Sequence, residues 1–197
     1  MFEKFSSWLG SISKGWLVLV FFALDLLFVL LILPGAQAKI EAYSGGIGPL
    51  DLTFFPSVEM TNMYLDAYDA NEAFPIDEGR AFYTNFELTV DLIYPIVYTF
   101  FFSLLISFLL RRSFDKTSRL HLLNLLPFGA WLFDLIENIC IVILLSSFPA
   151  EEPAIATILM VANGIKWLFA GASILTVFFA FSAWIFRKVN AKQPAVS

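Results

Sequence analysis

Four long apolar runs alternate with polar segments along the chain. They extend over residues 16–34, 86–110, 120–148 and 155–186. A helix needs about 20 mostly apolar residues to cross the hydrocarbon core of a bilayer. The pattern therefore predicts an all-α, polytopic membrane protein, with residues 1–197 forming a single membrane domain that is a bundle of four transmembrane helices.

Composition supports this prediction. Of the 197 residues, 59% are hydrophobic and 15% are charged, whereas a soluble domain usually carries about 25% charged residues. One histidine and one cysteine exclude a multi-histidine metal site and a disulfide framework within one chain. The sequence also has no glycine-rich phosphate loop and no basic stripe for nucleic acid. We therefore expect no metal, no cofactor and no nucleic-acid partner.

Basic residues gather in three of the five segments outside the apolar runs. Because basic residues favour the cytoplasmic side of a membrane, we expect both termini in the cytoplasm, most simply across a bacterial inner membrane. The loop of residues 35–85 is acidic and would be extracytoplasmic. The basic residues of the three segments are Lys4, Lys14, Arg111, Arg112, Lys116, Arg119, Arg187, Lys188 and Lys192.

A small-residue motif follows the first run. Ala36-Gln37-Ala38 resembles a signal-peptidase site, but the preceding run is long for a signal core and contains Asp25. Cleavage after Ala38 is the alternative to a first span that is retained. It would leave three spans in the same orientation.

The extracytoplasmic loop of residues 35–85 is expected to form a cap. Ser57 can cap a short amphipathic helix that lies over the outer mouth of the bundle or at the interface, while Asp66 and Asp69 point away from its apolar face. The alternative is a packed connecting loop. The apolar positions of this helix are Val58, Met60, Met63, Tyr64 and Tyr68.

Polar side chains recur one helical turn apart inside the apolar runs, which places them on one face of each predicted helix. Glu87, nearest the outer interface, could be hydrated or paired with Arg80. The residues are Asp25 in the first run; Glu87, Asp91, Tyr94 and Tyr98 in the second; Asp134, Glu137 and Asn138 in the third; and Asn163 and Lys166 in the fourth.

These faces predict an inward-facing acidic site. Lys166 is the only basic group deep in any run, so most of the facing carboxyl groups must be protonated, hydrated or matched by a bound cation. The alternative is a structural ion pair that fixes the register of the helices. The candidate ligand-binding residues are Asp25, Asp91, Tyr94, Asp134, Glu137, Asn138, Asn163 and Lys166.

Three functions are compatible with such a site. The first is binding of a lipid-like or cationic small molecule, or of protons. The second is a membrane enzyme on a lipid substrate, with Glu137 or Asp134 as general acid or base and Asn138 or Tyr94 orienting the substrate. The third is a non-catalytic subunit or scaffold of a membrane complex. Membrane lipid is the expected partner, and a homo-oligomer is an open possibility.

Two segments, GRAFYTNFELTVDLIYPIVYTFFFSLL and LLPFGAWLFDLIENICIVILL, resemble uncharacterised bacterial four-span membrane proteins, a resemblance that implies no activity. By analogy, four-span proteins of the sterol-isomerase and sigma-2 receptor type place carboxylates and aromatic residues in an intramembrane cavity that binds cationic amphiphiles. The deep histidine of the isomerases has no counterpart here, and the outer loop is longer. The positions shared with the bacterial proteins are Gly79, Arg80, Tyr83, Glu87, Asp91, Tyr94, Pro95, Tyr98, Pro127, Asp134, Glu137 and Asn138.

Overall fold

The structure, a computed structural model, describes residues 1–190 and contains no strand in that part of the chain. Four helical segments are long and apolar enough to cross a membrane. They confirm the predicted all-α bundle of four spans and indicate a multi-pass membrane protein. Lys192, one of the basic residues above, lies outside the described residues. The four segments are Gly15–Ser44, Glu78–Ser113, Arg119–Ser147 and Pro153–Asn190.

The first span is longer than predicted. It consists of α2 (Gly15–Leu27), a π-helical turn (Phe28–Ile32) and α3 (Leu33–Ser44). Pro34 does not end the helix because it lies in the first turn of α3, where its missing N–H group matters least. The predicted cleavage motif at residues 36–38 therefore lies inside α3.

The second span is bent. It is built from α5 (Glu78–Leu88) and α6 (Val90–Ser113), which are joined at Thr89. The backbone of Thr89 leaves the helical conformation, with φ −125° and ψ −79°. The helix begins eight residues before the predicted start at residue 86 because α5 carries polar residues that pack against the cap.

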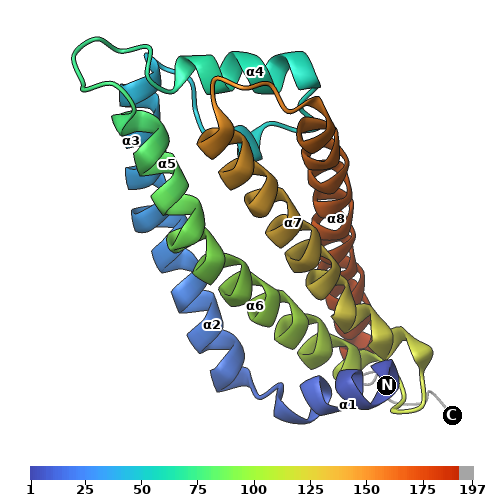
Figure 1. The fold of residues 1–197 in the computed structure, drawn as a ribbon. Coiled ribbons are helices and arrows are strands. Elements are labelled where there is room, and N and C mark those ends of the chain that lie inside the picture. Colours follow the sequence, from blue (N-terminus) through green and yellow to red (C-terminus); the bar gives the residue numbers. More distant parts are fainter. Residues whose placement is uncertain (191–197) are drawn as a thin grey trace, which may run out of the picture.

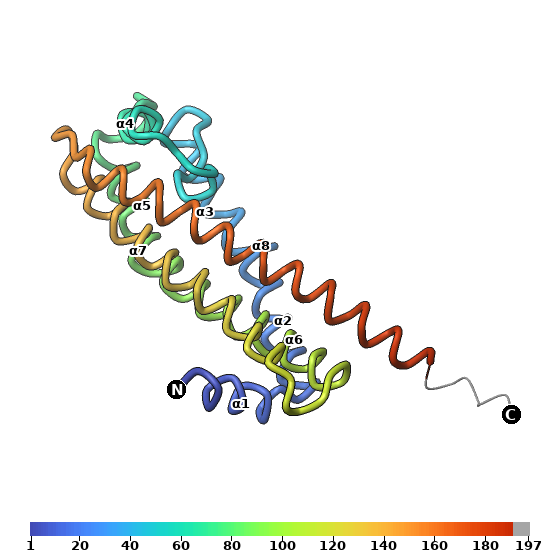
Figure 2. Tube along the Cα trace, turned by 90° about the vertical axis from the view of Figure 1, so that its right-hand side faces the viewer, coloured from blue at the N-terminus to red at the C-terminus, as the bar shows by residue number. Residues whose placement is uncertain are grey.

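The third and fourth spans form an antiparallel pair. A 3₁₀ segment (Arg119–Leu125) leads into α7 (Leu126–Ser147), and α8 (Pro153–Asn190) has 38 residues without a break. At about 1.5 Å per residue, α8 is about 57 Å long, which exceeds the hydrocarbon core of about 30 Å. It must therefore tilt or extend out of the bilayer, and Figure 2 shows it running along one edge of the bundle.

Two short helices lie across the ends of the bundle (Figure 1). Helix α1 (Phe2–Ile12) crosses the end where α6 finishes and α7 begins. Helix α4 (Val58–Ala67) crosses the opposite end, above α7 and α8. The second and third spans are the most buried of the four, and the first is the most exposed.

The cap confirms the predicted helix start but corrects its buried face. The Ser57 hydroxyl accepts a hydrogen bond from the Met60 backbone N–H at 3.2 Å, as expected for an N-cap residue. However, Met60 and Met63 are 38% and 53% exposed. The buried positions are Thr61 and Leu65, because the helix turns this face towards the ends of α7 and α8.

Asp69 and Arg80 form an ion pair that the residue spacing did not predict. Asp69 was expected to point away from the apolar face of the cap helix, and pairing with Arg80 was one of two alternatives for Glu87. Instead the Arg80 guanidinium pairs with Asp69 at 2.7 Å and with Asp77 at 2.6 Å. The Asp69 carboxylate also accepts a hydrogen bond from the Gly79 backbone N–H at 2.8 Å. Asp69 thus fixes the first turn of α5 to the cap.

The main hydrophobic core lies beneath the cap. Tyr68, at the end of α4, is 1% exposed and donates a hydrogen bond to the Gly48 carbonyl at 3.3 Å. Burial, and to a smaller degree the nearby Asp51 carboxylate, raises the pKa of the Tyr68 phenol well above its ordinary value, so the phenol stays a neutral donor. The core includes Ile40, Leu50, Leu65, Tyr68, Tyr83, Phe86, Cys140, Ile141, Leu144, Leu145, Ala156 and Leu159.

Candidate functional site

A buried ion pair joins α7 to α8. The Lys166 ammonium forms salt bridges with the Glu137 carboxylate and, at 3.3 Å, with Asp134. The Asn163 amide donates a hydrogen bond to the second Glu137 oxygen at 2.8 Å. Residues spaced by three on each helix lie on one face, so the predicted polar faces of the third and fourth spans do meet.

The loop that precedes α4 reaches this ion pair. The Asp51 carbonyl accepts hydrogen bonds from the Asn163 amide at 3.3 Å and from the Lys166 ammonium at 3.4 Å. The Asn163 side-chain oxygen, Oδ1, accepts a hydrogen bond from the Phe55 backbone N–H at 2.7 Å. Residues 51–55 therefore cover the end of the site that is nearest the cap. Asn163 links α7, α8 and this loop.

Close packing fixes the loop against α8. A Cβ atom at Gly164 would lie 2.7 Å from the Phe55 ring, so the missing side chain of this glycine makes room for the aromatic residue. Phe55 itself has a positive φ of 53°, which is uncommon for a residue with a side chain. The loop is held in this conformation by its contacts with the helices.

Asp51, in the loop of residues 35–85, brings into the site a carboxylate that the helical spacing of polar residues does not predict. Its side chain accepts a hydrogen bond from the Tyr83 hydroxyl at 2.7 Å. The same hydroxyl accepts from the Leu50 backbone N–H at 3.0 Å. One signal could have suggested Asp51: it is a lone acid in the short apolar stretch GPLDLTFF.

Asp91 is held by the third span. The Asn138 amide donates to the Asp91 carboxylate at 2.7 Å and to its backbone carbonyl at 3.1 Å. Glu87, one turn towards the cap, is 1% exposed, and neither of its carboxyl oxygens has a hydrogen-bond partner. Glu87 is thus buried inside the bundle, and Arg80 pairs with Asp69 and Asp77 instead.

A cavity of about 280 Å³ opens beside this network. Its walls come from α3, α5, α6, α7, α8 and the loop around Asp51, and they combine apolar, aromatic and acidic side chains. Four of the eight predicted ligand-binding residues line it. The lining residues are Leu33, Gln37, Pro49, Asp51, Leu52, Phe86, Asp91, Tyr94, Tyr98, Phe102, Asp134, Lys166, Trp167, Ala170 and Ile174.

The other four predicted residues do not line the cavity. Glu137, Asn138 and Asn163 lie behind it, at 0%, 3% and 0% exposure, where they hold Lys166 and Asp91 in place. Asp25 is half-buried near the Tyr94 phenol, and its Oδ1 atom has no hydrogen-bond partner. The structure therefore separates cavity residues from supporting residues, a distinction that helical spacing could not make.

The site contains more acid than base. Five carboxyl groups, from Asp51, Glu87, Asp91, Asp134 and Glu137, are buried around one ammonium group, Lys166. Within residues 1–190, no group of three or more histidine, cysteine, aspartate and glutamate side chains is arranged to hold a metal ion. The carboxyl groups are therefore spread around the cavity and the ion pair.

Comparison of the chain with models of protein families, with curated proteins and with solved structures finds no match in any of the three. The fold and the site geometry are therefore the basis for a functional conclusion.

Proposed function

We propose that the protein binds a small cationic or lipid-like molecule in the cavity beside the buried ion pair. The observation that carries this proposal is the charge of the cavity wall. Asp51, Asp91 and Asp134 line the cavity, and the only cation in its lining, Lys166, is already shared between Asp134 and Glu137. A positively charged ligand group in the cavity would neutralise the buried carboxylates that no cationic side chain of the protein neutralises.

The aromatic lining fits the same kind of ligand. Tyr94, Tyr98 and Trp167 lie beside the acidic groups, and aromatic faces attract ammonium groups, most strongly where water is excluded. A cavity of about 280 Å³ is near the lower end of the range for ligand pockets, about 300–1,000 Å³. It suits an ammonium head group whose apolar tail remains among the lipids.

Glu87 favours protons as a second occupant of the same network. An ionised carboxylate without any partner in an apolar interior costs several kcal/mol, and both of its oxygens are unpartnered. A bound proton removes this cost. Proton binding at Glu87 and cation binding in the cavity are compatible, since Glu87 does not line the cavity wall.

Acid–base catalysis is less well supported. A general acid or base must come within hydrogen-bond reach of the reacting atoms, but Glu137 is fully buried behind the cavity and bonded to Lys166 and Asn163. Of the two expected orienting residues, Asn138 donates its amide hydrogen bond to Asp91, whereas Tyr94 lines the cavity. Asp134 lines the cavity, yet it pairs with Lys166.

Binding of a radiolabelled decyltrimethylammonium ion to the purified protein in phosphatidylcholine nanodiscs tests the proposal. We expect saturable binding that unlabelled ion displaces and that decanol does not. Asp91→Asn and Asp134→Asn should each weaken binding at least tenfold, which corresponds to about 1.4 kcal/mol. Asp66→Asn, at an exposed position of the cap, is the matched control and should bind like the parent.

The proposal is overturned if the parent shows no saturable binding, or if the two cavity variants bind as well as the control. In the first case, purification of a stable larger complex would instead favour the scaffold function. Altered membrane lipids in a deletion strain that a Glu137→Gln copy does not restore would favour the enzyme.

A further inference from the structure

A second pocket, of about 460 Å³, lies at the opposite end of the bundle from the cap. Its lining residues belong to α1, the end of α6, the loop of residues 114–118 and the 3₁₀ segment. Figure 1 shows α1 crossing this end of the bundle. None of the pocket residues belongs to the acidic site. The lining residues are Glu3, Ser6, Ser7, Gly10, Ser11, Ser107, Arg111, Lys116, Thr117, Ser118, Arg119, His121, Leu122 and Asn124.

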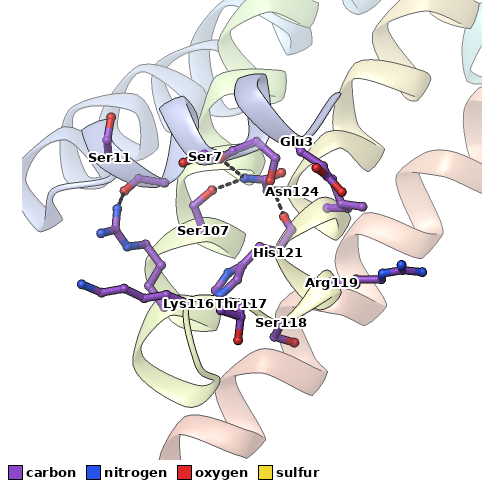
Figure 3. A pocket seen from close by; sticks show the side chains of 14 residues that line it. Glu3, Ser7, Ser11, Ser107, Lys116, Thr117, Ser118, Arg119, His121 and Asn124 are labelled. Atoms are coloured by element: carbon purple, nitrogen blue, oxygen red, sulfur yellow. Dashed lines mark hydrogen bonds between the residues drawn. The ribbon is translucent and has the colours of Figure 1, made fainter. Parts of the chain in front are cut away.

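The floor of this pocket is a fixed polar network. Asn124 is 1% exposed, and its amide donates to the Ser6 carbonyl at 3.1 Å and to the Ser107 hydroxyl at 2.8 Å. The Ser6 hydroxyl donates to the His121 carbonyl at 2.9 Å. Figure 3 shows Asn124, Ser107 and His121 grouped in the centre of the pocket. The Asn124 Oδ1 atom is buried without a hydrogen-bond partner.

The pocket carries unneutralised positive charge. Arg111, Lys116 and Arg119 line it, and within residues 1–190 none of them takes part in a salt bridge. The only acidic residue in the lining is Glu3. The Arg111 guanidinium donates to the Gly10 carbonyl at the end of α1, which holds it at the pocket. The Arg119 side chain extends away from Ser107, Asn124 and His121 (Figure 3).

Helix α1 sets the depth of the pocket in the membrane. One face of α1 contributes serine and glycine to the pocket, and the other exposes Phe2, Phe5 and Trp8 at 72%, 37% and 47%. These three residues are spaced by three and form one stripe. An amphipathic helix with such a stripe lies in the interface, with its apolar face at the acyl boundary, and tryptophan is enriched at that depth. The pocket therefore lies at the level of the lipid head groups.

We propose that this pocket binds the phosphate of an anionic phospholipid head group, with Arg111 and Lys116 contacting the phosphate and the exposed Ser7 hydroxyl donating a further hydrogen bond. Basic pockets between transmembrane helices are suited to such head groups because charge attraction and head-group depth coincide. A free phosphate compound offers the same chemistry, but the depth set by the stripe on α1 favours the lipid.

Native mass spectrometry of the full-length protein with added dioctanoyl-phosphatidylglycerol or dioctanoyl-phosphatidylcholine tests this. We expect the parent to bind the phosphatidylglycerol at least tenfold more tightly. Arg111→Gln/Lys116→Gln should lose most of that preference. Arg187→Gln/Lys188→Gln, which removes two cations at the end of α8 outside this pocket, is the matched control and should keep it.

A second variant keeps the test independent of any effect on folding. Ser7→Asp adds a negative charge at an exposed position of the lining, and it should abolish the preference by repulsion. The proposal is overturned if the parent shows no preference, or if both double variants lose it equally, since general surface charge would then be the cause. If glycerol phosphate or inorganic phosphate binds as tightly as the lipid, the lipid assignment is overturned in favour of a soluble phosphate.

Discussion

Removal of the Lys166 ammonium measures how strongly the buried ion pair holds α7 to α8. Lys166→Met keeps the length of the apolar side chain but removes the charge that contacts Glu137 and Asp134. Both carboxylates are buried, at 0% and 6% exposure, so water cannot replace the lost partner. Breaking a buried pair from one side costs about 3–5 kcal/mol.

The assay is thermal unfolding of the detergent-solubilised protein, followed by tryptophan fluorescence. For a chain of this length, 1 kcal/mol shifts the melting temperature by about 2–4 °C, so Lys166→Met should lower it by about 6–20 °C. Glu137→Gln should also lower it, because the Lys166 ammonium keeps Asp134 as its only carboxylate partner. The double variant, Glu137→Gln/Lys166→Met, should recover about 0.5–3 kcal/mol of the summed losses.

Lys188→Met is the control, since it makes the same substitution on an exposed lysine and should leave the melting temperature unchanged. If the stability loss of the double variant equals the sum of the two single losses to within about 0.5 kcal/mol, the two charged groups are not coupled. That result would refute the buried ion pair as a stabilising contact. If Glu137→Gln is as stable as the parent, the charge does not support the fold, which would strengthen the case for a functional role.

Two further substitutions test the cap. Gly79→Ala should lower the melting temperature and make the cap more sensitive to limited proteolysis, because the added Cβ atom would lie 1.8 Å from the Tyr68 carbonyl oxygen. Gly171→Ala is the control: it has open space around it and should leave the stability unchanged or raise it by up to about 1 kcal/mol. Tyr83→Phe removes the hydroxyl that donates a hydrogen bond to the buried Asp51 carboxylate, so it should lower the free energy of unfolding by about 1–3 kcal/mol. An unchanged urea unfolding curve would contradict the importance of this hydrogen bond.

The four spans could be predicted from the sequence because a segment that crosses the bilayer must be a helix of about 20 mostly apolar residues. The four apolar runs meet this requirement and are helical in the structure. The Ser57 cap was also predictable, because an N-cap depends only on residues next to each other in the chain. The predicted ends of the spans were less accurate. Helix α3 extends the first span, and α5 extends the second span, through polar residues that the cap stabilises.

Helical spacing also predicted that Asp134, Glu137, Asn163 and Lys166 face one another, and they do. It could not distinguish residues that line the cavity from residues that support them. That distinction depends on the rotation and separation of neighbouring helices, which side-chain packing along their whole length decides.

The sequence by itself therefore determined that the chain is a helical membrane protein with acid inside its bundle. Only the tertiary structure decided that Asp51 enters the site from the loop that precedes α4, that Asp69 rather than Glu87 pairs with Arg80, and that Asp25 lies beside Tyr94 but not in the cavity wall. The physical reason is distance along the chain. Contacts within one helix follow from a fixed period, whereas Asp51 and Lys166 meet across 115 positions through the packing of several helices and a loop together.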